Sequence, residues 1–478
     1  MKNSLLLLFI LYFSLIFMSC VSNKPDIKSS KPMEDIPTKW LSWDKNISQD
    51  QKPIYWVETF TNPELNEAIR IAWSSNPELV AQAEQTLARG EEAVIVGANL
   101  SPQANLGVSG TRSKRNLIGF NLPNGDTSFT SDSFNSGINL SWELDLWGKL
   151  KNQKKSAERR FNVATSDYEG ARLSIAGKVA KAWFEIIESS QQSQLALKTM
   201  NTFEKNQAFI SNRFKNGLAT ALENDLAINA YESARATFSM RNRQRSKSTR
   251  KFELLLGGFP DEKKEHNSSL LPELFGTPPP PTPAKILEQR PDLISSRLRL
   301  EAAGYQLSAS QLSLLPAVSI TGGPGSRAEN FEDLLDNKFR TWDIGGSLTQ
   351  PIFQGGRLKA QIRRDEALKR AALANYKAMA LRAFNEVENL LFNDTRLEAE
   401  ESYLKNATKA AQSASQTSWD RYQRGVQEIF ETLDIHRRSF EAESRLLSIR
   451  KERILNRIGK EAIKVKEKRL FEAKKKAK

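Results

Sequence analysis

The chain has 478 residues, of which 39% are hydrophobic and 26% are charged, and its formal net charge is +14. A mean hydropathy of −0.51 and the lack of an internal apolar run of about 20 residues exclude a membrane protein built from many apolar helices. The positive charge gives little support to nucleic-acid binding, because its excess is concentrated in residues 241–251 and 464–478.

The first 20 residues differ from the rest of the chain. A basic residue precedes an apolar run from Leu5 to Met18, and Cys20 follows shortly after. The run is too short to span a bilayer stably, so residues 1–19 are predicted to be a signal peptide. Cys20 is the only cysteine and stands where a lipoprotein signal places its acylated residue. We expect a covalent lipid on Cys20, anchoring an arm over residues 20–62, with an unmodified cysteine as the alternative.

An internal repeat organises most of the sequence. Asn76-Pro77-Glu78-Leu79 resembles Arg290-Pro291-Asp292-Leu293, and Arg213-Phe214-Lys215-Asn216-Gly217 resembles Arg421-Tyr422-Gln423-Arg424-Gly425. The first pair is offset by 214 residues (76 to 290) and the second by 208 (213 to 421). We therefore predict two copies of one unit, at 63–257 and 284–460, with a linker at 258–283 and a basic tail at 461–478.

Each copy contains two segments that alternate apolar and polar residues, as strands do. We predict strands over about residues 103–113, 134–146, 316–324 and 341–353. Any membrane span must consist of strands, because no internal helix is apolar enough. A soluble sheet with one face on a core is the alternative. The residues expected to face lipid are Ile138, Leu140, Trp142, Trp342 and Ile344.

Long helices are expected over most of the remaining chain. Residues 149–216 and 357–424 contain no proline, and each lies between two glycines. Their apolar residues recur every seven positions, which is typical of helices that supercoil around neighbours. At 1.5 Å per residue each helix would be about 100 Å long. Shorter helices are predicted to return over 218–256 and 426–460, and helices of about 30 residues to end at Ala98 and Leu314.

Four strands per chain are too few to close a barrel, and open strand edges are not tolerated in lipid. Three chains would supply twelve strands and would gather their helices around one axis. The expected fold is mostly α with a β-barrel contribution. Its four strands per chain would close as a trimeric 12-stranded outer-membrane β-barrel, continued by a long α-helical barrel.

Four motifs are specific enough to compare with a known family. They are Trp142-Glu143-Leu144-Asp145-Leu146-Trp147-Gly148-Lys149, Gln350-Pro351-Ile352-Phe353-Gln354-Gly355-Gly356-Arg357, Arg290-Pro291-Asp292 and Arg421-Tyr422 with Gly425 and Leu433-Asp434. They resemble TolC/OprM-type outer-membrane efflux factors of the lipoprotein branch, over about residues 60–460. The resemblance implies the passive duct of a tripartite efflux system in the outer membrane of a Gram-negative bacterium, extending into the periplasm. It implies as partners two further copies of the chain, a periplasmic membrane-fusion adaptor, an inner-membrane pump of the RND or ABC type, and outer-membrane lipids.

The turns that follow the long helices are the expected place of a gate. Gly217 and Gly425 end these helices about 100 Å from the strands. The resemblance implies that Tyr422, Gln427, Glu431 and Asp434 form the links and acidic rings of a closed aperture, with Gln427 in place of the usual arginine. Glu223 and Asp225 lie beside the first turn and are expected to contribute. The alternative is that these acids only favour the starts of helices.

The sequence shows no arrangement of catalytic or cofactor-binding residues. Its 2 histidines, His266 and His436, are too far apart in the sequence for a metal site or a catalytic triad within one chain. We therefore expect no enzyme and no cofactor, apart from the lipid on Cys20. Two alternatives stay open: a conduit for type I protein secretion, and an exported coiled-coil scaffold without a conduit.

Overall fold

The computed structural model describes residues 37, 39–42, 62–116, 128–262, 270–274, 280 and 282–462. The chain divides into two compact units. Besides N-terminal residues, the first unit contains 88–163 and 296–377, and the second contains 35–87, 164–295 and 378–478. Each unit therefore combines segments from both copies of the sequence repeat.

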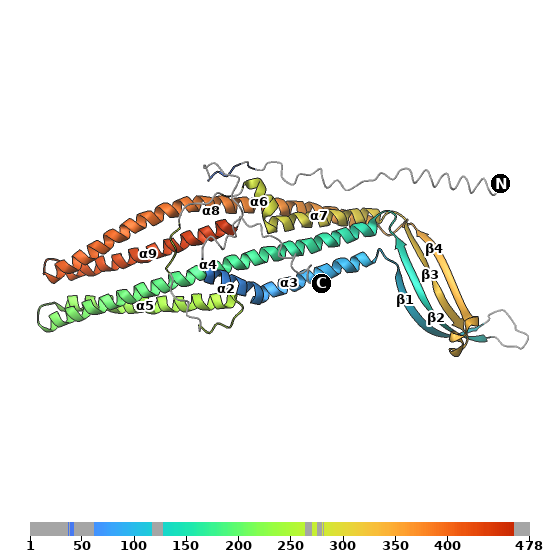
Figure 1. The fold of residues 1–478 in the computed structure, drawn as a ribbon, viewed down its shortest axis with the longest axis horizontal. Coiled ribbons are helices and arrows are strands. Elements are labelled where there is room, and N and C mark those ends of the chain that lie inside the picture. Colours follow the sequence, from blue (N-terminus) through green and yellow to red (C-terminus); the bar gives the residue numbers. More distant parts are fainter. Residues whose placement is uncertain are drawn as a thin grey trace, which may run out of the picture. The chain divides into compact units, whose positions relative to one another are not determined.

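In the first unit, four strands form one antiparallel sheet in the order β1-β2-β3-β4 (Figure 1). The strands are β1 Gln103–Asn116, β2 Ser128–Leu144, β3 Ala317–Ala328 and β4 Arg340–Thr349. The β1–β2 hairpin is longer than the alternation indicated and reaches the pair Asn116–Ser128, because backbone pairing continues where the side chains are polar on both faces. β4 ends before the expected residue 353, because Pro351 has no N–H to donate to a ladder.

The connection from β3 to β4 contains two short 3₁₀ turns, η2 Glu332–Leu335 and η3 Asn337–Phe339. Phe331, just before η2, packs edge-on against Phe134 of β2 with ring centroids 5.9 Å apart. This contact fixes the connection to one face of the sheet.

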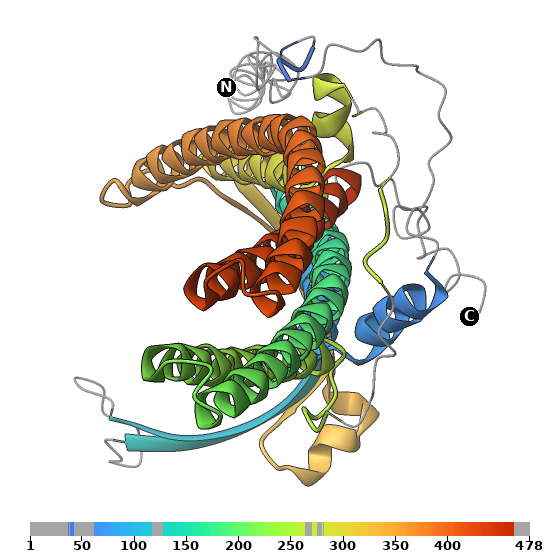
Figure 2. The ribbon, with the colours of Figure 1, turned by 90° about the vertical axis from the view of Figure 1, so that its left-hand side faces the viewer.

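Two helical hairpins contain the longest elements of the chain. α4 Lys149–Lys215 and α8 Arg357–Gln423 have 67 residues each. They are followed by the return helices α5 Ala221–Leu255 and α9 Ile429–Ala462. Figures 1 and 2 show the two hairpins side by side, with their turns at the same end. Both return helices begin three residues later than predicted, because each turn takes more residues than the glycine alone.

The helices expected to end at Ala98 and Leu314 are each interrupted. Proline starts the second helix in both cases, since it fits a first helical turn and disfavours helix in the residue before it. The Oδ1 atom of Asn76 accepts hydrogen bonds from the backbone N–H groups of Glu78 and Leu79, and its Nδ2 donates to the Leu255 carbonyl at 2.9 Å. The repeated motif therefore marks a helix start. The helices are α2 Pro63–Ser75, α3 Pro77–Ala98, α6 Pro283–Gln289 and α7 Pro291–Leu312.

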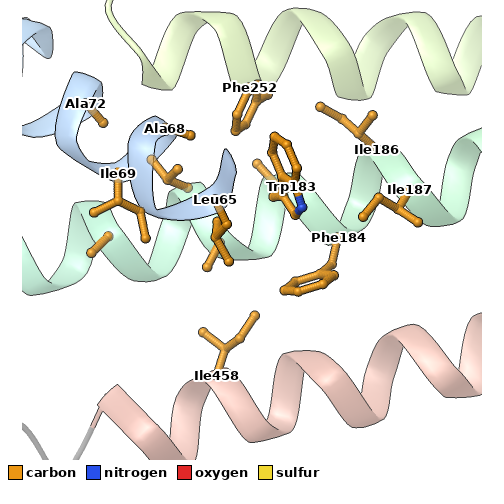
Figure 3. Packing of buried hydrophobic residues seen from close by; sticks show 14 of the residues in the cluster. Leu65, Ala68, Ile69, Ala72, Trp183, Phe184, Ile186, Ile187, Phe252 and Ile458 are labelled. Atoms are coloured by element: carbon orange, nitrogen blue, oxygen red, sulfur yellow. The ribbon is translucent and has the colours of Figure 1, made fainter. Parts of the chain in front are cut away.

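A large buried cluster lies in the second unit, where α2, α4, α5 and α9 meet (Figure 3). Leu65 of α2, Phe252 of α5 and Ile458 of α9 are at most 1% exposed. Trp183 of α4 packs against Phe252 with ring centroids 5.6 Å apart. Burying a side chain of this size contributes about 1.5–3 kcal/mol, so this cluster fixes the hairpins and α2 to one another.

Candidate functional site

The sheet has one apolar and one polar face. Its register pairs Leu140 with Gly322 and Gly322 with Ile344, and it pairs Trp142 with Ile320. Residues paired in this way point to the same face. Trp342 is 79% exposed and Trp142 is 37% exposed, and the Trp142 ring nitrogen donates to the Leu100 carbonyl at 3.0 Å. All five residues predicted to face lipid therefore lie on one exposed face: Ile138, Leu140, Trp142, Trp342 and Ile344.

The opposite face carries the intervening polar residues. Asn139, Ser141 and Glu143 alternate with the apolar residues of β2. Glu143 forms an ion pair with Lys149 at 2.5 Å, and Ser319 and Ser347 share a hydrogen bond of 2.8 Å across β3 and β4. This face can therefore line water.

Within the described residues, every helix is too short or too polar to cross a membrane.

The turns after α4 and α8 have the same backbone structure. Gly217 and Gly425 have φ angles of +73° and +76°, which glycine adopts without strain. The Leu218 amide donates to the Arg213 carbonyl at 2.8 Å, and the Val426 amide donates to the Arg421 carbonyl at 3.1 Å. These bonds are those of a Schellman helix end. The repeat has thus kept the geometry of both turns.

The acids beside the first turn differ in their surroundings. Glu223 forms a capping box with Thr220: its carboxylate accepts from the Thr220 amide at 2.7 Å, and its own amide donates to the Thr220 hydroxyl at 3.2 Å. Asp225 is exposed on the next part of α5. Glu223 therefore stabilises the start of α5, which is the alternative that the sequence left open for this residue.

Tyr422 lies in an aromatic cluster between the two hairpins. Its ring centroid is 5.7 Å from that of Trp419 and 6.4 Å from that of Phe209. The guanidinium of Arg213 lies 5.8 Å from the centre of the Tyr422 ring. The hydroxyl is buried and has no hydrogen-bond partner within the described part of the chain. Burial raises the pKa of Tyr422, and the negative charge of Glu223 adds to this rise.

Gln427 belongs to a short chain of hydrogen bonds that ties the second turn to α8. Its Nε2 donates to the Ser418 hydroxyl at 2.7 Å. The Ser418 hydroxyl in turn donates to that of Thr432 at 3.2 Å, and Thr432 donates to the Glu428 carbonyl at 2.9 Å. The amide thus makes a neutral link where the resemblance leads one to expect an ionic one.

The acids at the start of α9 also differ from each other. Glu431 is exposed in the first turn of the helix. Asp434 forms ion pairs with Arg437 at 2.5 Å and Arg438 at 2.6 Å. The hydrogen bond from Arg437 is the main reason why the pKa of Asp434 lies below its usual value. Within one chain, the charge of Asp434 is therefore already balanced.

Sequence reasoning missed His436 as a member of this cluster. The His436 ring lies 5.8 Å from Trp419 and 6.3 Å from Phe203. Its Nδ1 is 2.9 Å from the Ser415 hydroxyl, whereas its Nε2 is buried without a partner in the described residues. Burial lowers the pKa of His436. Its place two residues after Asp434, on the apolar stripe of α9, was the available signal.

A groove of about 530 Å³ lies beside this cluster, between α4, α5 and α9. Apolar residues from all three helices line it, among them Phe203, Leu226 and Phe440. Arg241 and Arg445 lie at the same groove, and Arg241 donates to the Ser444 hydroxyl at 3.2 Å. Asp434, Arg437 and Glu441 line it as well, so the groove combines an apolar lining with charges of both signs.

Two further expectations concerned a lipid on Cys20 and the absence of a metal site. Cys20 lies outside the described residues. Among the residues that the structure describes, no three His, Cys, Asp or Glu side chains are grouped so that they could hold a metal ion.

The family model described as "Outer membrane efflux protein" matches residues 68–258 and 282–458. The outer membrane protein OprJ of Pseudomonas aeruginosa is 28% identical over 407 residues, 84% of each chain. The probable outer membrane lipoprotein SilC of Salmonella typhimurium is 25% identical over 455 residues, 93% of this chain and 95% of its own. The CmeC outer membrane channel of Campylobacter jejuni has a similar fold, with a TM-score of 0.82 at 20% identity over 92% of this chain and 94% of that one. These findings confirm the family resemblance and the expected fold class.

Proposed function

We propose that this chain, which belongs to the outer membrane efflux protein family and is a subunit of an outer-membrane efflux channel, closes its conduit as a homotrimer. The observation that carries this proposal is the four-stranded sheet. In the described residues β1 and β4 each pair with one strand only, and unpaired strand edges are costly in lipid. Neighbouring copies would supply the missing partners, and three copies would give twelve strands.

The two faces of the sheet support a division between lipid and water. Ile138, Leu140, Trp142, Trp342 and Ile344 would contact lipid, and the face of Asn139 and Ser141 would line the conduit. A covalent lipid on Cys20 would add a second attachment to the membrane.

The helical turns would form the gate of the closed channel. Gly217 and Gly425 shape both turns, and Tyr422, Gln427, Glu431 and Asp434 would close the aperture with help from Asp225. Glu223 would hold the start of α5 beside them. This proposal is supported by the orphan hydroxyl of Tyr422 and by the exposed carboxylates of Glu431 and Asp225. Asp434 would change its arginine partners when the gate opens.

An adaptor and a pump would complete the system. The groove between α4, α5 and α9 fits a helical segment of a periplasmic membrane-fusion adaptor, because a helix in a groove needs an apolar floor and complementary charge. An inner-membrane pump of the RND or ABC type would supply the energy, and the duct itself would not act as an enzyme. A conduit for type I protein secretion would have the same architecture. The two functions would therefore be distinguished by which inner-membrane pump binds.

The test is the mass and conductance of the purified full chain. In detergent we expect a trimer by light scattering and, in planar bilayers, a channel with low conductance and cation selectivity. Glu431→Ala combined with Asp434→Ala should raise the conductance and weaken block by divalent cations. The double variant Arg243→Ala and Arg245→Ala, at two exposed residues of α5, serves as the control. A stable monomer without conductance would reject the proposal.

A further inference from the structure

One face of α3 is left uncovered by the rest of the described chain. Val80, Leu87 and Val94 recur every seven residues and are 47%, 60% and 64% exposed. Glu84 and Glu91 lie between them on the same face and are also exposed. Neither carboxylate has an ion pair among the described residues. Together these five residues have the spacing of the a and d positions of a coiled coil, with glutamate at a.

The first part of α8 has a complementary face. Ala360, Ala367 and Ala374 recur every seven residues and are exposed. Arg363 and Arg370 lie between them at the other coiled-coil position, are exposed, and have no ion pair in the described part of the chain. This face therefore has small residues at a and bases at d.

One antiparallel register matches the two faces at all five positions. In an antiparallel coiled coil, an a residue of one helix lies beside a d residue of its partner. Placing Leu87 beside Ala367 puts Glu91 beside Arg363 and Glu84 beside Arg370. The same register places the two remaining large residues of α3 against the two remaining alanines of α8, so size and charge are complementary at all five positions. These pairs are Val94 with Ala360 and Val80 with Ala374.

The direction of the helices agrees with this register. α3 runs toward β1 and α8 runs away from β4. β1 and β4 are the two outer strands of the sheet. Where β4 of one copy pairs with β1 of the next, the helices attached to them run antiparallel and adjacent.

The chain already contains a contact of the same kind within one copy. Ser156 of α4 donates to the Ala302 carbonyl of α7 at 2.9 Å. Moving Ser156 forward by the repeat offset of 208 gives Arg364, and moving Ala302 back by 214 gives Ala88. The repeat therefore places Arg364 of α8 near Ala88 of another copy, which is within one helical turn of the register derived from size and charge.

We propose that α3 of one copy packs antiparallel against α8 of the next copy, with Leu87 against Ala367, and with the ion pairs Glu91–Arg363 and Glu84–Arg370. This interface rests on the proposed homotrimer and specifies which surfaces join its subunits. The charges exclude a shift by one core position, because it would place large residues against arginine. The contact derived from Ser156 and Ala302 favours this register over one shifted by a heptad.

Charge reversal tests the ion pairs in the full-length channel. Glu84→Arg with Glu91→Arg should shift the purified protein from trimer to monomer, and so should Arg363→Glu with Arg370→Glu. Combining all four substitutions should restore the trimer, because the pairs are re-formed with opposite sign. Arg243→Glu with Arg245→Glu, which changes the same amount of charge on α5, should leave the trimer intact. The ion pairs would be overturned if each double reversal disrupts the trimer and the fourfold variant fails to restore it.

Cross-linking tests the register independently. Leu87→Cys combined with Ala367→Cys should give a covalent trimer on oxidation, because a disulfide requires Cα atoms about 4.4–6.8 Å apart. Leu87→Cys with Ala360→Cys, displaced by one heptad, should not. A trimer by mass that does not cross-link would reject this interface and leave the proposed duct standing, whereas a parent protein that is monomeric would reject both. A disulfide within a single chain would also overturn the interface.

Discussion

Replacing Tyr422 by phenylalanine tests whether this side chain links subunits at the aperture. The ring is 4% exposed, and its hydroxyl finds no hydrogen-bond partner within the described residues. A buried polar group without a partner costs about 1–3 kcal/mol. If the hydroxyl has no partner in the assembled channel either, Tyr422→Phe should leave the protein equally stable or more stable by about 1 kcal/mol.

The opposite result is expected if the hydroxyl bonds to a neighbouring subunit when the channel is closed. Each lost hydrogen bond would then cost about 0.5–1.5 kcal/mol, and the threefold axis would repeat the loss in every subunit. The closed state would lose roughly 1.5–4.5 kcal/mol in total. That is enough to shift the gate measurably toward the open state, since 1.4 kcal/mol changes an equilibrium about tenfold.

Two measurements on the same samples decide between these outcomes. Single-channel conductance reports the gate, and thermal unfolding reports the stability of the subunit. Tyr231→Phe is the control, because the hydroxyl of this partly buried tyrosine donates to Glu204 of its own hairpin at 3.3 Å and so already has a partner within the chain. We expect Tyr422→Phe, but not Tyr231→Phe, to raise the conductance. Unchanged conductance with higher stability would remove Tyr422 from the gate.

Three other predictions concern the membrane and pH. Trp142→Asp should impair membrane insertion by placing a carboxylate on the lipid face, whereas Asn139→Asp should be tolerated. An equal loss of membrane-inserted trimer in the two variants would contradict the assignment of faces. Cys20→Ser should abolish incorporation of labelled palmitate while part of the trimer survives, and unchanged labelling would exclude acylation at this residue. Because burial lowers the pKa of His436, its neutral form favours the folded state, so stability should fall as pH drops below the usual histidine pKa of about 6.5. His436→Phe should reduce this pH dependence of thermal unfolding, and His266→Phe, which removes the other histidine, serves as the control. An unchanged pH profile in His436→Phe would refute the assignment.

The sequence predicted the regular parts of the molecule well, because their signals repeat over many residues. The heptad stripe and the absence of proline indicated α4 and α8, and both helices begin at the predicted residue. The end of β4 was placed too late, because the apolar Ile352 and Phe353 continue the pattern after Pro351 has ended the backbone pairing. Periodicity reports which face is apolar, and it does not report where hydrogen bonding stops.

The break between α2 and α3 shows a second limit. Asn76 and Pro77 were used to find the repeat, and the same residues contain the signals of a helix start. A single helix of about 30 residues was expected because the apolar pattern continues through this point. The contact from Asn76 to the Leu255 carbonyl joins segments far apart in the sequence, and no local pattern indicates such a partner.

The two turns show why a repeat predicts backbone better than chemistry. The turns at Gly217 and Gly425 have the same backbone hydrogen bonds, because each long helix ends in a left-handed conformation that glycine adopts without strain. Glu223 and Glu431 occupy matching positions, yet only Glu223 has a threonine three residues earlier to complete a capping box. Glu431 follows Glu428 instead and stays exposed. The first turn therefore satisfies its carboxylate locally, and the second leaves one available to a neighbouring subunit, so the gate has to be tested at α9 before α5.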